Sequence, residues 1–199
     1  MSTPDILAAL TPVVDAFERL GIAYHIGGSV ASSAYGFARA TLDVDLVADV
    51  QVAHVQPLVA LLQEAYYIDR EMVQEAIRHR SSFNVIHLDT MIKVDVFILK
   101  PQPYHQEAFR RARRDTLVDT LVEEEPAREF YLASPEDVIL NKLDWFRLGG
   151  GVSDRQWNDV LGVLKVQASS LDLVYLRRWA AELGLTGLLD RAFNEAGIT

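Results

Sequence analysis

The chain has 199 residues, half of them hydrophobic, and a formal net charge of −9. This composition supports a sizeable core and argues against intrinsic disorder, and the negative charge argues against a broad basic surface for nucleic acid. The absence of cysteine excludes disulfides and thiolate metal sites. The chain starts without the features of a signal peptide, and no apolar run is long enough to span a bilayer, so we expect a cytoplasmic protein with no membrane partner.

Helices and strands alternate in the first part of the chain. Thr3, Pro4 and Asp5 are typical of a helix start, and the apolar stripe that follows predicts a helix ending at Gly21. The elements predicted next are a strand over 23–27, a helix over 30–35, an acidic strand over 42–47, a helix over 52–65, a strand over 66–68 and a helix over 71–78.

Two strands, residues 82–88 and 91–99, are predicted on either side of a tight turn at Asp89 and Thr90. A helix over 106–114 then carries the basic run Arg110 to Arg114, which we interpret as a solvated helix face, with a local basic groove as the alternative. Two further strands are predicted over 116–122 and 128–132, separated by an acidic loop.

The chain is predicted to be helical after Ser134. Ser134 and Pro135 are typical of a helix start, and the glycines at 149–151 end that helix. Further helices are predicted over 153–165, 171–183 and 185–196, and the helical spacing of Trp145, Trp157 and Trp179 predicts that they lie in the core. We therefore expect two domains, residues 1–132 and a helical region over 133–199.

Three carboxylates fall on predicted strands. Side chains on a strand alternate between its faces, so Asp43 and Asp45 point the same way, and Lys93, Asp95 and Phe97 share one face of a later strand. Neighbouring carboxylates disfavour each other's ionised form, so a hard divalent cation with oxygen ligands is expected among them. The alternative is a half-exposed edge strand with a solvent-facing Asp95.

A glycine-rich turn precedes the acidic strand. Gly27 and Gly28 let the backbone approach a ligand closely, and Ser29 would open a helix whose free N–H groups suit a phosphate. Phosphate beside a carboxylate-bound metal is the arrangement used for phosphoryl or nucleotidyl transfer. The histidines have no metal-ligand spacing and are predicted at the core edge or surface, although His25 lies just before the glycine turn.

Gly28 and Ser29, followed by Asp43, Asp45 and the later strand aspartate Asp95, resemble the nucleotidyltransferase superfamily of polymerase beta-like fold. Together with Arg39 and Thr41, the pattern is most similar to abortive-infection-type nucleotidyltransferase toxins and their uncharacterised relatives. The segment from Ser134 to Leu143 and the later Asp154, Arg155 and Asp159 are similar to the helical part of that group. The resemblance implies an α+β fold, in which a small mixed or antiparallel sheet flanked by helices is followed by a C-terminal helical part.

The resemblance also implies residue roles. Asp43, Asp45 and Asp95 would be catalytic and bind Mg²⁺, and Gly28, Ser29, Arg39 and Lys142 would bind the nucleotide. The alternative for Arg39 is a surface arginine paired with a nearby acid, and that for Lys142 is a solvated helix position. Asp159 resembles a polar position of the family's second helix, with or without a role in the site.

The function expected from these residues is a Mg²⁺-dependent nucleotidyltransferase. It would move a nucleoside monophosphate from a nucleoside triphosphate, such as ATP, onto an acceptor hydroxyl of RNA, a protein or a small molecule, and release pyrophosphate. The acidic net charge favours a small molecule or a protein as acceptor. The alternatives are a catalytically silent nucleotide-binding or toxin–antitoxin partner protein of the same fold, and a structural module that forms oligomers through its C-terminal helices.

Overall fold

A computed structural model describes residues 3–41, 43–117 and 128–198, with side chains from residue 5 onward. The chain forms two compact units. The first, the sheet unit, comprises Met1–Gly27 and Ala40–Leu132, and the second, the helical unit, comprises Gly28–Arg39 and Ala133–Thr199. The division into domains at residue 132 stays a prediction.

In the described part of the sheet unit, seven strands form one mixed sheet in the order β3-β4-β5-β2-β1-β7-β6. β2 runs parallel to β5 and β1 parallel to β7, whereas the other neighbouring strands are antiparallel. The strands are β1 (Tyr24–Ile26), β2 (Asp43–Ala48), β3 (Tyr66–Tyr67), β4 (Ser82–His87), β5 (Lys93–Ile98), β6 (Arg113–Thr116) and β7 (Glu129–Leu132).

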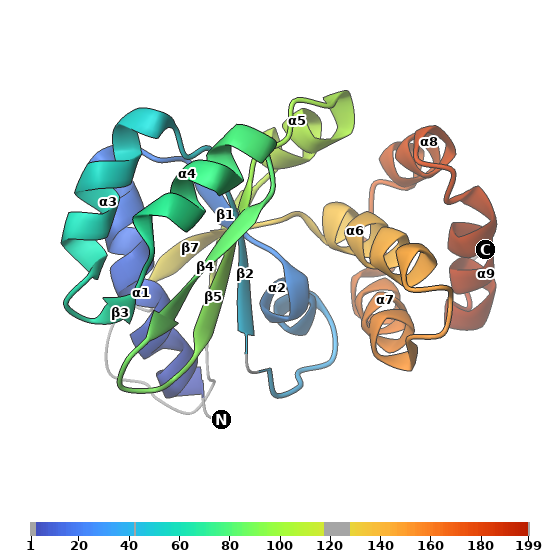
Figure 1. The fold of residues 1–199 in the computed structure, drawn as a ribbon. Coiled ribbons are helices and arrows are strands. Elements are labelled where there is room, and N and C mark those ends of the chain that lie inside the picture. Colours follow the sequence, from blue (N-terminus) through green and yellow to red (C-terminus); the bar gives the residue numbers. More distant parts are fainter. Residues whose placement is uncertain (1–2, 42, 118–127, 199) are drawn as a thin grey trace. The chain divides into compact units, whose positions relative to one another are not determined.

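The central strands have one fully buried face and one half-buried face. Residues along β2 and β5 alternate strictly between these states, as the two-residue period of a strand requires. The buried face is apolar, as Val44, Leu46, Val94 and Val96 show, whereas the carboxylates lie on the other face. Several helices of this unit lie along one side of the sheet (Figure 1). The helical segments of this unit are α1 (Thr3–Leu20), η1 (Val52–His54), α3 (Val55–Leu62), α4 (Arg70–His79) and α5 (Pro103–Arg110).

The helical unit begins with α2, directly after Gly27, and continues with the C-terminal helices. Its helices are α2 (Gly28–Tyr35), α6 (Pro135–Leu148), α7 (Asp154–Gln167), α8 (Leu173–Glu182) and α9 (Thr186–Ala196). α6 packs against α2, α7 and α8, and α7 also packs against α2 and α9. The expected fold class, an α+β chain with a small mixed sheet and a C-terminal helical part, is confirmed.

Two buried acidic residues at the N-terminus of α6, Glu136 and Asp137, connect this helix to α8. Ser134 caps the helix by accepting a hydrogen bond from the Asp137 N–H at 3.2 Å, as predicted. The Asp137 carboxylate accepts a hydrogen bond from the Tyr175 hydroxyl at 2.7 Å, and Glu136 accepts one from the Asp172 backbone N–H at 2.9 Å. Both acids are fully buried. Their partners lie on α8 and at its N-cap, so these bonds fix α8 against α6.

Several expectations need correction. The run Arg110 to Arg114 is not one helix face, because α5 ends at Arg110 and β6 begins at Arg113. Trp157 and Trp179 are buried as expected, but Trp145 is 57% exposed because the phase of α6 turns it toward solvent. The predicted strand over 116–122 and the acidic loop after it fall mainly on 118–127, outside the described residues, as does residue 42 at the start of the acidic strand.

Among the described residues, no helix combines the length and the apolar character that crossing a bilayer requires.

Candidate active site

The three aspartates predicted to bind metal are brought onto one face of two neighbouring strands. In the parallel pair of β2 and β5, Asp45 lies directly opposite Asp95, and Asp43 lies directly opposite Lys93. On the other side of β5, Asn84 of β4 is the register partner of Asp95. The alternation of the strands leaves all three carboxylates half-buried on the same face. We call Asp43, Asp45, Asp95 and Lys93 the carboxylate cluster.

A lysine belongs to this cluster. Lys93 Nζ lies 2.6 Å from Asp95 Oδ2 in an ion pair whose side chains are 43% and 18% exposed. The hydrogen bond to Asp95 raises the pKa of Lys93 most, burial opposes this, and the negative charges of Asp95, Asp43 and Asp45 raise it further. All three carboxylates therefore favour the charged form of this lysine, and Asp95 contacts it directly.

Among the described residues, no three acidic or histidine side chains are arranged as a group that would hold a metal ion. The chemistry of the carboxylate cluster nevertheless fits a divalent cation. Carboxylate oxygens on adjacent strands are the hard ligands that Mg²⁺ prefers, and the ammonium of Lys93 already occupies a cation position beside Asp95. Asp43, Asp45 and Asp95 are thus the residues that would hold the metal.

Thr41 positions one of these carboxylates. The Thr41 side chain is buried, and its hydroxyl donates a hydrogen bond to Asp43 Oδ1 at 2.9 Å. Thr41 Oγ1 also lies 3.1 Å from the Asp43 backbone carbonyl oxygen. Because a hydrogen bond orients the ligand oxygen, Thr41 supports the site without touching the expected metal.

We expect Thr41→Val to lower divalent-metal affinity by about 10- to 100-fold, the usual cost of losing a group that orients a metal ligand. Valine keeps the shape of threonine but cannot donate to Asp43. The measurement is a Mn²⁺ titration by calorimetry, with Thr41→Ser as the matched control because serine retains the hydroxyl. Equal affinities of the valine and serine variants would show that the hydrogen bond does not support the site.

A second cluster, in the helical unit, gathers Ser29, Arg39, Lys142 and Asp159. Arg39 Nε lies 2.8 Å from Asp159 Oδ1 and Arg39 Nη2 lies 2.9 Å from Asp159 Oδ2, so the guanidinium clamps the carboxylate with two hydrogen bonds. Lys142 Nζ donates to the same Oδ2 at 2.7 Å, and Arg39 Nη2 also donates to Ser29 Oγ. The four side chains form one network, which we call the Asp159 network.

The Asp159 network is largely buried. The side chains of Lys142 and Asp159 are each 6% exposed, and that of Arg39 is 25% exposed. Burial tends to raise the pKa of Asp159, but the hydrogen bonds and charges of Arg39 and Lys142 outweigh it, so this pKa lies below its usual value. The solvated alternative for Lys142 is wrong, whereas Arg39 does pair with an acid.

The glycine turn lies where the two units join in the chain. Gly28, the first residue of α2, has a φ of 55°, a left-handed conformation that favours glycine. The Gly27 N–H donates a hydrogen bond to the Asp45 carbonyl oxygen at 2.8 Å, which ties the end of β1 to β2. Ser29 follows as the second residue of α2 and is buried.

His25 lies on the same face of the sheet as Asp45, because its register partner in β2 is Val47. Its ring packs against Phe109 of α5 with centroids 5.3 Å apart, and it is buried. Burial lowers the pKa of His25 to about 4, so the ring is neutral at pH 7. A neutral, covered imidazole adds no charge to the carboxylate cluster.

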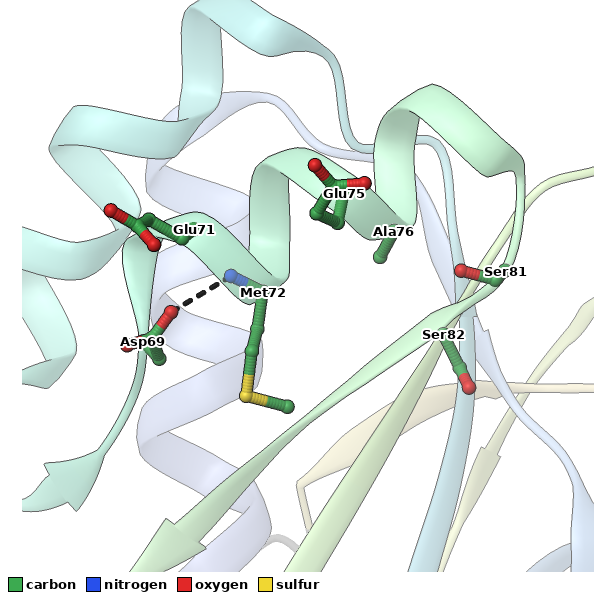
Figure 2. Close-up of a pocket in the computed structure, with 7 residues that line it drawn as sticks. All are labelled: Asp69, Glu71, Met72, Glu75, Ala76, Ser81 and Ser82. Atoms are coloured by element: carbon green, nitrogen blue, oxygen red, sulfur yellow. Dashed lines mark hydrogen bonds between the residues drawn. The ribbon is translucent and has the colours of Figure 1, made fainter.

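A cavity of about 550 Å³ opens elsewhere on the sheet unit, beside α4 and the start of β4 (Figure 2). Its acidic residues are Asp69, Glu71 and Glu75, and Asp69 is already engaged as the cap of α4, accepting from the Met72 N–H at 2.8 Å. None of the predicted site residues lines this cavity. We therefore place the candidate site at the carboxylate cluster.

The fold is similar to that of solved nucleotidyltransferase structures. The solution structure of the antibiotic-resistance factor ANT(2'')-Ia matches with a TM-score of 0.54 at 14% identity, covering 98% of this chain and 100% of that one. Its crystal structure in complex with adenylyl-2"-tobramycin matches with a TM-score of 0.55 at 14% identity, covering 92% and 97%. An antigenic nucleotidyltransferase-like protein from Paracoccidioides brasiliensis matches with a TM-score of 0.56 at 16% identity, covering 98% and 94%. No protein-family model and no curated protein matches the sequence.

Proposed function

We propose that this chain, which has the fold of nucleotidyltransferases, is a Mg²⁺-dependent enzyme that transfers a nucleoside monophosphate from a nucleoside triphosphate to an acceptor hydroxyl. The observation that carries the proposal is the placement of Asp43, Asp45 and Asp95 on one face of β2 and β5, with Asp45 directly opposite Asp95. Aspartate is unfavourable in strands, so three at such positions indicate a chemical role.

The chain's own residues divide the work of the reaction. Asp43 and Asp45 would hold the metal of the nucleotide, and Asp95 would complete the metal site and accept the proton of the attacking hydroxyl. When bound, Mg²⁺ supplies charge stabilisation for the triphosphate and the leaving pyrophosphate. The new bond joins the acceptor oxygen to the α-phosphorus, and the bond that breaks is the one to pyrophosphate.

Phosphate binding is proposed for Gly28, Ser29, Arg39 and Lys142, as the family resemblance implies. Support comes from the Asp159 network, where a hydroxyl and two cationic side chains gather around one carboxylate. Asp159 touches both cations, so we assign it a positioning role. The Asp159 carboxylate holds the Arg39 guanidinium and the Lys142 ammonium in one orientation each, although both groups lie at the ends of flexible side chains.

A small molecule is the acceptor that we favour. The net charge of −9 disfavours a long polyanion such as RNA. One structure that shares the fold is a complex with adenylyl-2"-tobramycin, a nucleotidylated small molecule. A toxin or antitoxin partner stays a prediction, as does a cytoplasmic location.

One observation favours a second candidate, a protein that binds a nucleotide but transfers nothing. Lys93 pairs with Asp95 and so occupies one of the three carboxylates needed for catalysis. The alternatives differ in product, because only an enzyme would release pyrophosphate.

The test is to incubate the full chain with Mg²⁺ and a triphosphate labelled at either the α- or the γ-phosphate, together with a cell extract fractionated by size. Transfer predicts that only the α-label enters an acceptor and that pyrophosphate is released in equal amount. Label in the small-molecule fraction supports our choice, and label in RNA or protein would replace it. Nucleotide binding without pyrophosphate release would favour the second candidate.

A further inference from the structure

We infer that Lys93 is a built-in cation of the carboxylate cluster, which holds Asp95 in the absence of metal and competes with a divalent cation for it. This inference rests on the proposed function, because it deepens the assignment of the same carboxylates. It assigns a role to a residue outside the expected ligand set.

The position of Lys93 carries the inference. It is the register partner of Asp43 on the neighbouring strand, and it lies two residues before Asp95 on the same face of β5. Its Nζ lies 2.6 Å from Asp95 Oδ2, the distance of a direct charge-assisted hydrogen bond. The ammonium is therefore placed among carboxylates from both strands, where the expected metal would also bind.

The positive charge of Lys93 affects how strongly the three carboxylates bind a metal ion. The three carboxylates of Asp43, Asp45 and Asp95 repel one another, and a lysine among them offsets part of that repulsion. A divalent cation that binds through Asp95 must displace the ammonium from Oδ2 or bind beside a positive charge. In both cases Lys93 weakens metal binding, so the metal-free cluster is stable and the metal site is filled only at higher metal concentration.

The geometry also separates this role from that of an ordinary surface ion pair. The pair of Arg177 with Asp190, by contrast, joins two exposed side chains of α8 and α9, and exposed ion pairs of this kind contribute little to stability. At Lys93 the neighbouring strand places Asp43 directly opposite, and Asp45 opposite Asp95. Removing the lysine therefore changes the charge that a bound metal meets, whereas removing an isolated surface lysine does not.

The test compares Lys93→Met with Lys100→Met in the full chain, using Mn²⁺ alone as the probe and calorimetry as the measurement. Both variants lose one lysine, but Lys100 is exposed beyond the end of β5. We expect Lys93→Met to bind Mn²⁺ about tenfold or more tightly than the unmodified chain, because a unit positive charge a few ångströms from the ion is lost. Lys100→Met should bind as the unmodified chain does, and the difference should shrink at high salt.

Thermal unfolding provides a second measurement, which distinguishes a change in metal binding from a failure of the variant to fold. Without metal, Lys93→Met should melt below Lys100→Met because its carboxylates have lost their cation, and saturating Mn²⁺ should raise its melting temperature by the larger amount. Equal Mn²⁺ affinities for the two variants would overturn the inference and leave the proposed function standing. Failure of the unmodified chain and both variants to bind Mn²⁺ would overturn both.

Discussion

Replacing Asp45 with asparagine is expected to reduce kcat/KM for nucleotidyl transfer by about a thousandfold or more while leaving the chain folded. Asp45 lies between the other two acids, two residues from Asp43 and directly opposite Asp95. Asparagine has nearly the same shape but no charge, so the expected metal loses a ligand that neutralises it. A metal-bound transition state is stabilised by several kcal/mol, and this amount corresponds to the expected loss of rate.

The matched control is Asp49→Asn, which removes the same charge just beyond the end of β2. The measurement is the initial rate of pyrophosphate release at saturating Mg²⁺, together with the melting temperature of each variant. Asp45→Asn should melt at the same or a higher temperature than the unmodified chain, because it relieves repulsion between carboxylates. A rate within tenfold of the control would remove Asp45 from the catalytic machinery.

Asp159→Ala is expected to destabilise the helical unit by about 3–5 kcal/mol, the usual cost of removing one partner from a buried ion pair. The substitution leaves the Lys142 ammonium buried without its carboxylate, and it also removes both hydrogen bonds of Arg39 to that carboxylate. The loss should therefore exceed that for any exposed ion pair of this unit.

The stability of the helical unit can be measured separately from that of the sheet unit. All three tryptophans, Trp145, Trp157 and Trp179, belong to the helical unit, so tryptophan fluorescence during urea unfolding reports on that unit alone. The matched control is Asp190→Ala, which removes a half-exposed carboxylate 3.5 Å from Arg177 and should cost at most about 1 kcal/mol. Equal losses for the two variants would show that the Asp159 network does not stabilise the helical unit.

The pH dependence of this stability has a definite sign. The folded pKa of Asp159 lies below its unfolded value, because Arg39 and Lys142 favour the ionised form more than burial disfavours it. The ion-pair contribution is therefore complete above about pH 4 and is lost as the pH falls through the folded pKa. The difference in unfolding free energy between the unmodified chain and Asp159→Asn should be constant near neutral pH and shrink below about pH 4.

The spacing of apolar residues in the sequence predicted much of the fold, because a strand or helix with one buried face needs apolar residues at a regular spacing. Strict alternation along β2 and β5 placed Asp43 and Asp45 on one face, and the cap at Ser134 marked the start of α6. The spacing of apolar residues predicts a helix more reliably than it predicts which side of that helix is exposed. Trp145 is an example, because apolar and polar residues are buried around most of α6 and the spacing alone does not identify the side on which Trp145 is exposed.

The contacts of the site were harder to predict than its residue types. Arg39 and Asp159 are 120 positions apart in the chain, and no local pattern indicates that a guanidinium from one segment meets a carboxylate from the other. Strand period placed Lys93 beside Asp95, but the ion pair between them became evident only from side-chain positions. The run from Arg110 to Arg114 failed for a different reason, because its residues divide between the end of α5 and the start of β6.

The most direct test of the metal site is anomalous diffraction from crystals soaked with Mn²⁺ and a non-hydrolysable nucleoside triphosphate. We expect a Mn²⁺ peak at the carboxylates of Asp43, Asp45 and Asp95, about 2.0–2.6 Å from the oxygens that bind it, with a phosphate oxygen completing the coordination. We also expect Lys93 Nζ to have moved away from Asp95 Oδ2 in that crystal. A peak elsewhere, or nucleotide bound while these carboxylates stay free of metal, would contradict it.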